Sequence, residues 1–162
     1  MKKLARKYRE KYLNEIIVDT TYLLPILGIS VEGLDERDYD YIIENFHMIY
    51  PIPLLAELSA VVIKQARKEG FKEIPKQAIE GLNSIIYSEK VELESLRGED
   101  LKIIYTLSNL GWRDIFDSIL YATAIRLNMK ILTMDKEFKK FLKQNNLKHE
   151  ILISHKQLKS SH

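Results

Sequence analysis

The chain of 162 residues contains no cysteine, which excludes disulfide bonds, thiolate zinc sites and cysteine nucleophiles. No apolar run approaches the roughly 20 residues that span a bilayer, so no membrane-crossing segment is expected. The six glycines form neither a phosphate-binding loop nor a dinucleotide-binding loop. The formal net charge is only +2, so overall charge does not indicate a nucleic-acid partner. We therefore expect a soluble, cytoplasmic protein whose chemistry depends on oxygen-bearing and nitrogen-bearing side chains.

What the chain does contain is typical of one folded domain. Hydrophobic residues make up 46% and charged residues 30% of the sequence, which is enough apolar material for a core. The charged start leads into no long apolar segment, so no secretory signal is expected. We predict a basic helical extension over 1–14, one domain over 15–155 and a frayed tail over 156–162.

Hydrophobic periodicity alternates along the chain between short buried runs and amphipathic segments. The short runs predict strands, and the amphipathic segments predict helices. Strands that alternate with helices are typical of βαβ units and a parallel sheet. The predicted strands are 16–18, 47–50, 90–93, 130–133 and 149–153, and the predicted helices are 22–27, 35–46, 54–68, 75–88, 100–110, 114–128 and 136–145.

Four carboxylates occupy positions that one edge of such a sheet would present. Asp19 ends an apolar run and Asp135 follows another, while Glu57 and Asp117 fall in the first turns of predicted helices. Ligands of open α/β sheets bind beyond the carboxyl ends of the strands, where all four would meet. Clustered carboxylates repel one another and favour a hard cation such as Mg²⁺ or Mn²⁺. Such a site can hydrolyse phosphodiesters.

Each acid also has a simpler interpretation. An Asp after a strand is commonly a helix N-cap, and this holds for Asp19 and Asp135 taken singly. Asp114 lies three residues before Asp117 and is either a cap or a fifth, peripheral metal ligand. Glu57 is the strongest single candidate, because its neighbours are leucines and an unpaired buried carboxylate is costly. The combination is more informative than any member.

Four segments, in this order and spacing, resemble the PIN-domain family, which includes VapC-like toxin ribonucleases. They are Ile16–Thr21, Tyr50–Leu58, Asp117–Ala124 and Ile131–Asp135, and the resemblance covers about residues 15–153.

The resemblance implies a three-layer α/β/α fold with a central parallel sheet of four or five strands. It further implies a ribonuclease whose Mg²⁺ or Mn²⁺ is bound by Asp19, Glu57, Asp117 and Asp135. Thr133, and Thr20 or Thr21, would support the site through hydroxyl groups. A homodimer and a silencing antitoxin protein are the expected partners.

Other functions remain open at this point. The resemblance is equally compatible with an RNA-processing nuclease outside a toxin–antitoxin pair, because the N-terminal extension is long and residues 74–96 match no motif. A non-catalytic PIN-fold binding module is the alternative from another class. A dehalogenase-like phosphatase would need an Asp where Thr21 stands. A phosphate-receiver domain would need an acidic pair where only Glu15 is found.

Basic side chains offer candidate contacts to a phosphate backbone. Arg113 precedes the acids of its helix, and Lys136, Lys139, Lys140 and Lys143 recur at helical spacing after Asp135. A solvated helix face is the default interpretation of these lysines. Trp112 is expected to plug the core. The four histidines show no spacing typical of a metal site, and His47 is expected to be structural.

Overall fold

The computed structural model describes residues 14–160. The predicted basic helix over 1–14 lies outside these residues, except for Asn14, which begins the first strand. The described residues form a five-stranded, all-parallel sheet in the order β3-β2-β1-β4-β5. The strands are β1 (Asn14–Val18), β2 (Phe46–Pro51), β3 (Val91–Glu94), β4 (Ile131–Leu132) and β5 (Leu152–Ile153). The predicted fold class is confirmed.

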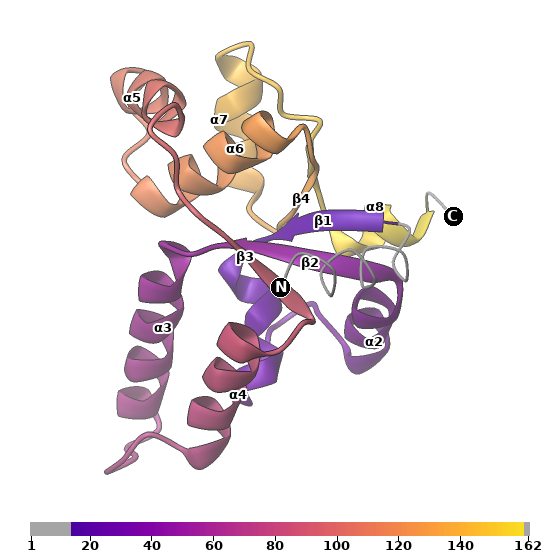
Figure 1. The fold of residues 1–162 in the computed structure, drawn as a ribbon, viewed down its shortest axis with the longest axis vertical. Helices are drawn as coiled ribbons and strands as arrows, with labels where there is room; N and C mark the ends of the chain where they lie inside the picture. The colour runs from indigo at the N-terminus through magenta and orange to yellow at the C-terminus, as the bar shows by residue number, and fades with distance from the viewer. Residues whose placement is uncertain (1–13, 161–162) are drawn as a thin grey trace.

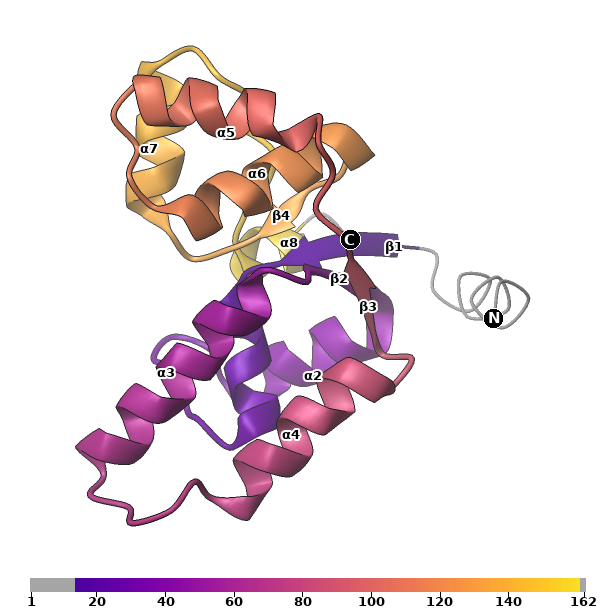
Figure 2. The same cartoon turned by 60° about the vertical axis from the view of Figure 1, so that its left-hand side comes forward.

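Helices cover both faces of the sheet, which gives the three-layer arrangement (Figures 1 and 2). One layer holds the 3-10 helix η1 (Thr20–Leu27), α2 (Glu36–Asn45), α3 (Leu54–Lys68) and α4 (Lys76–Tyr87). The other holds α5 (Asp100–Asn109), α6 (Ile115–Leu127) and α7 (Lys136–Gln144). A last helix, α8 (His155–Ser160), ends the described chain.

The central strand β1 explains why both layers are needed. Its residues Ile16, Ile17 and Val18 are at most 2% exposed. A strand that is apolar on both faces has to be covered on both sides, as is usual in parallel sheets. The sequence therefore places β1 at the centre of the sheet. Asp19, which directly follows β1, is held at the carboxyl edge by this buried strand.

Helix α4 approaches η1 very closely at Gly81. A Cβ atom at this position would lie 2.4 Å from the carbonyl oxygen of Ile26. Only glycine fits, because that oxygen belongs to backbone and cannot rotate away. This contact packs α4 directly against η1, the segment that follows Asp19.

The predicted frayed tail needs correction. Residues from His155 to Ser160 form α8, in which His155 and Leu158 are only 3% and 6% exposed. The hydroxyl of Tyr22 lies 2.9 Å from His155 Nδ1, and Lys159 forms an ion pair with Asp38. A six-residue helix carries too little periodicity to be recognised, so its anchoring depends on tertiary partners. The domain therefore continues to residue 160.

Across residues 14–160, no helix combines the length and apolar character that a membrane crossing requires.

Candidate active site

The site lies at the carboxyl edge of the sheet, between β1 and β4. The chain passes from β1 to β2 and β3 on one side, and returns to β4 and β5 on the other. This reversal of strand order opens a crevice beyond the strand ends, which is where open α/β sheets bind ligands. Asp19 directly follows β1 and Asp135 follows β4, so both border this crevice.

Thr133 joins these two acids. Its Oγ1 donates to Asp19 Oδ2 at 2.8 Å and accepts from the backbone N–H of Asp135 at 3.1 Å. Asp135 in turn caps α7, because its Oδ1 accepts from the backbone N–H of Phe138 at 2.9 Å. One buried hydroxyl therefore fixes the spacing between the end of β1 and the start of α7.

Asp117 lies in the first turn of α6 and is oriented by Trp112. The indole Nε1 donates to Asp117 Oδ2 at 3.1 Å. The indole ring also packs on Phe138 and Phe141 of α7, with ring centroids 4.8 and 4.9 Å away. Trp112 is thus the expected core plug and, in addition, a hydrogen-bond donor to a site acid. The sequence analysis missed this second role.

Asp114 serves as the N-cap of α6. Its Oδ1 accepts from the backbone N–H of Phe116 at 2.9 Å and of Asp117 at 3.2 Å. The cap interpretation of this residue is therefore satisfied, and one of its two oxygens already has partners. The side chain is exposed and adds its charge at the rim of the site.

Glu57 stands in the first turn of α3, close to Thr20. Burial raises the pKa of Glu57, and a side-chain hydrogen bond with Thr20 opposes this to a smaller extent. The Thr20 and Tyr50 hydroxyls lie 2.8 Å apart, and Tyr50 donates to the carbonyl of Leu54 at 2.8 Å. This chain of hydroxyls connects η1, β2 and α3 beneath Glu57.

The pKa shifts show that the acids act on one another. Burial raises the pKa of Asp19, and repulsion from Asp135 adds to it, against the hydrogen bond from Thr133 and the backbone N–H groups of Thr20 and Thr21. Burial raises the pKa of Asp117 to about 8, with further increases from Asp114, Asp135 and Asp19. Asp19 and Asp114 likewise raise the pKa of Glu57. The four predicted acids and Asp114 are therefore close enough for their charges to interact, which raises the pKa values of Asp19, Glu57 and Asp117.

This donor set fits a hard divalent cation. All candidate ligands are carboxylate oxygens, which Mg²⁺ and Mn²⁺ prefer, and a positive charge would relieve the repulsion that raises the pKa values. Within residues 14–160, however, no three of these acids bring their oxygens within 4.8 Å of one another.

The model of the PIN domain family matches residues 16–143 of this chain. The chain belongs to the PIN domain family. Membership supports a nuclease, and the predicted family is confirmed. A comparison with curated proteins finds no relative that matches.

Solved structures share this PIN fold at low sequence identity. A chain of Rickettsia felis VapBC2, crystallised with a DNA fragment from its promoter, is 16% identical with a TM-score of 0.56; the alignment covers 86% of this chain and 98% of that one. Mycobacterium tuberculosis VapC20, a toxin that cleaves the sarcin–ricin loop, is 13% identical with a TM-score of 0.58, over 77% of this chain and 93% of that one. At these identities the likeness concerns the fold.

The predicted basic residues of this PIN domain occupy different settings. Lys136 and Lys139 line a hollow of about 420 Å³ that reaches Asp135 and Thr133. Lys139 Nζ donates to the carbonyl of Leu152 at 2.8 Å, so this lysine also ties α7 to β5. The remaining predicted basic residues, Lys140, Lys143 and Arg113, are exposed. Lys156 of α8 lines the same hollow and was missed, because residues from 156 were expected to be frayed.

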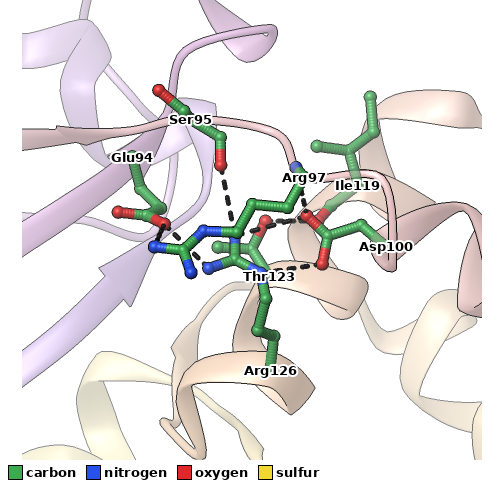
Figure 3. Close-up of polar contacts among 7 residues, drawn as sticks. All are labelled: Glu94, Ser95, Arg97, Asp100, Ile119, Thr123 and Arg126. Carbon is green, nitrogen blue, oxygen red and sulfur yellow. Dashed lines mark hydrogen bonds and ion pairs between the residues drawn. The ribbon is translucent and has the colours of Figure 1, made fainter.

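A buried ion-pair network holds α6 in this PIN domain (Figure 3). Arg126 Nε donates to Asp100 Oδ1 at 2.8 Å, and Arg126 Nη1 donates to Glu94 Oε1 at 2.8 Å. Asp100 is 1% exposed and also accepts from the backbone N–H of Arg97 at 2.9 Å. The network connects β3, α5 and the C-terminal half of α6, the helix whose first turn carries Asp117. Its partners are 26 and 32 residues apart in sequence, so no local pattern indicated it.

Proposed function

We propose that this PIN domain is a metal-dependent endoribonuclease and the toxin of a toxin–antitoxin pair. The observation that carries the proposal is the mutual electrostatic interaction of Asp19, Glu57, Asp117 and Asp135, which come from four separate elements. A fold without catalytic or cation-binding duty gains nothing from gathering acids whose repulsion raises their pKa values. The non-catalytic module is therefore the weaker alternative.

Asp19, Glu57, Asp117 and Asp135 would hold Mg²⁺ or Mn²⁺, with Asp114 as a peripheral contributor. When bound, such a cation lowers the pKa of a water molecule and stabilises the charge that develops on a phosphodiester. The chain's own groups orient the acids: Thr133 positions Asp19, and the Trp112 indole positions Asp117. A side-chain hydrogen bond with Thr20 helps to hold Glu57 in place.

The RNA backbone would approach along the hollow beside Asp135. Lys136, Lys139 and Lys156 line it, and positive side chains next to an acidic site offset its repulsion of phosphate. Lys140 and Lys143 would extend the positive surface along α7, and Arg113 would meet the strand on the side of α6.

The proposed partners are an antitoxin protein and a second copy of this chain. Both are partners that the resemblance to VapC-like toxins implies, and the Rickettsia felis VapBC2 neighbour, whose name joins toxin and antitoxin, supports the antitoxin. Exposed apolar side chains on α5 and at the start of α6 offer a surface for the second copy; they include Leu101, Tyr105 and Ile115.

An RNA cleavage assay tests the activity. Purified protein is incubated with structured and single-stranded RNA in Mn²⁺ or in EDTA, and Asp117→Asn is compared with the surface control Asp40→Asn. We expect wild type and Asp40→Asn to cleave in Mn²⁺ only, and Asp117→Asn to be inactive. Cleavage that persists in EDTA or in Asp117→Asn would contradict the proposed site.

Expression in a bacterial host separates the toxin from the alternative RNA-processing nuclease. A toxin arrests growth, and Asp117→Asn relieves the arrest. Cleavage in vitro without growth arrest would favour a processing nuclease outside a toxin–antitoxin pair. No cleavage and no response to Mn²⁺ would favour the non-catalytic module.

A further inference from the structure

A second group of metal-ligating side chains lies at the opposite edge of the sheet from the acids. It consists of Glu15, His47 and Glu92, which are the second residues of β1, β2 and β3. Glu15 and His47 are paired in register, and Ile49, two residues after His47, is paired with Glu92. Residues paired in register, and residues two apart, point to the same face of a sheet. All three side chains therefore project from one face.

The ligand atoms of these three side chains converge. One atom from each lies within 4.8 Å of the other two. His47 Nε2 is 3.0 Å from Glu92 Oε2, a separation suited both to a hydrogen bond and to two ligands of one metal ion. His47 is 4% exposed, whereas Glu15 is exposed, so the imidazole is held rigidly and the group can be reached from solvent.

A cavity of about 770 Å³ opens onto the group. Glu15, Glu92 and Glu94 line it, together with Asn128 and Lys130 near the end of α6. Arg126 already pairs with Glu94, and among the described residues Lys130 is the basic residue of the lining. Glu15 and Glu92 offer carboxylate oxygens and His47 offers an imidazole nitrogen, which are donor types that divalent transition metals bind.

We infer that Glu15, His47 and Glu92 form a transition-metal site, with Zn²⁺ as the cation that its donors fit best. Zn²⁺ accepts both imidazole nitrogen and carboxylate oxygen ligands, whereas the all-oxygen site at the other edge suits Mg²⁺ or Mn²⁺. Because metal ligands bind in their deprotonated form, the cation would replace the proton of the hydrogen bond between His47 and Glu92. It would join β1, β2 and β3 near their amino ends and stabilise the sheet.

The inference does not depend on the nuclease proposal, and the test separates them. Zn²⁺ binding is measured by titration calorimetry on full-length protein carrying Asp117→Asn, which weakens the acidic site. Glu15→Gln and Glu92→Gln are added singly, because both side chains are more accessible than His47 and their loss leaves the core intact. Glu150→Gln is the matched control, since Glu150 also lies beside a histidine, with His149 Nδ1 3.6 Å from Glu150 Oε2.

We expect one Zn²⁺ per chain, with affinity lowered roughly tenfold or more by Glu15→Gln and by Glu92→Gln. Glu150→Gln should leave the affinity unchanged. Substitution with Co²⁺ should give a visible absorption band that Glu92→Gln removes. If the parent protein binds no Zn²⁺, or if neither glutamine variant weakens binding, the site does not exist. Zinc binding that is instead lost in Asp19→Asn belongs to the acidic site, and this also overturns the inference.

Discussion

At the scale of single residues, the acidic site depends on hydroxyl and indole groups that fix carboxylates in place. Thr133 bonds to Asp19 and to the backbone of Asp135, and Trp112 bonds to Asp117 while packing on two phenylalanines. Neither supporting group is charged, so each orients a carboxylate without neutralising it. The carboxylates therefore still repel one another, and a bound cation would reduce this repulsion.

The raised pKa of Asp117 predicts how the stability of the protein depends on pH. The pKa of this carboxyl rises from 3.8 to about 8 in the folded protein, so between these values the folded state binds more protons than the unfolded chain. The free energy of unfolding in EDTA should therefore fall as pH rises from about 4 to about 8. Asp117→Asn removes this loss and should stabilise the protein at pH 8 by roughly 1–3 kcal/mol, with little effect near pH 4.

Urea denaturation at both pH values measures the effect, with Asp40→Asn as the control at an exposed site. Water that reaches the half-buried carboxylate reduces the shift, so the predicted gain is smaller than the full pKa change implies. Equal stability of Asp117→Asn and wild type at pH 8 would show that Asp117 is not buried among other acids.

At the scale of elements, α6 is the piece that has to be held, because it presents Asp114 and Asp117 from its first turn. It is anchored near its other end, where Arg126 pairs with Asp100 and Glu94 (Figure 3). The network therefore ties the C-terminal half of α6 to β3 and α5, at the end of the helix opposite the acids.

Removing Arg126 should be strongly destabilising. Arg126→Ala leaves the Asp100 carboxylate buried without its cation, which typically costs about 3–5 kcal/mol. The exposed pair of Lys76 and Glu80 provides the control, and Lys76→Ala should cost less than about 1 kcal/mol. Chemical denaturation compares the two. A loss below about 1 kcal/mol for Arg126→Ala would mean that the network is a surface feature.

At the scale of the whole molecule, titratable side chains gather at both edges of one sheet. The carboxyl edge carries the proposed acidic site at the switch point between β1 and β4, and the amino edge carries Glu15, His47 and Glu92. The helical layers also leave apolar side chains at the surface, and Tyr105 of α5 is 69% exposed.

The proposed homodimer can be tested by changing the apolar surface through which two copies would associate. Leu101, Tyr105 and Ile115 border a shallow hollow of about 580 Å³ on α5 and the start of α6. Tyr105→Glu should convert a dimer into a monomer, because it places a charge in an apolar contact. Tyr87 of α4 is 82% exposed, and Tyr87→Glu is the control that should stay dimeric. Light scattering coupled to size-exclusion chromatography gives the mass; a monomeric wild type would exclude the homodimer.

The sequence by itself determined most of the elements and their parallel arrangement, and it supplied the four acids as the proposed site. These follow from local features: apolar runs for strands, periodicity for helices, and the bounds of α3, which were predicted at the residues where the structure has them. Asp19 and Asp135 were predictable because residues that directly or shortly follow a parallel strand lie at the carboxyl edge.

The resemblance implied a supporting hydroxyl at Thr133, but only the tertiary structure decided which atoms it joins and which other groups meet. The bond of Trp112 to Asp117, the Arg126 network and the anchoring of α8 join residues through packing, which no local pattern encodes. His47 lacks any metal-site spacing in the sequence, yet sheet register sets it beside Glu15 and Glu92, which are 32 and 45 positions away. Strand pairing depends on the whole fold, and for that reason the contacts it creates can be read only after folding.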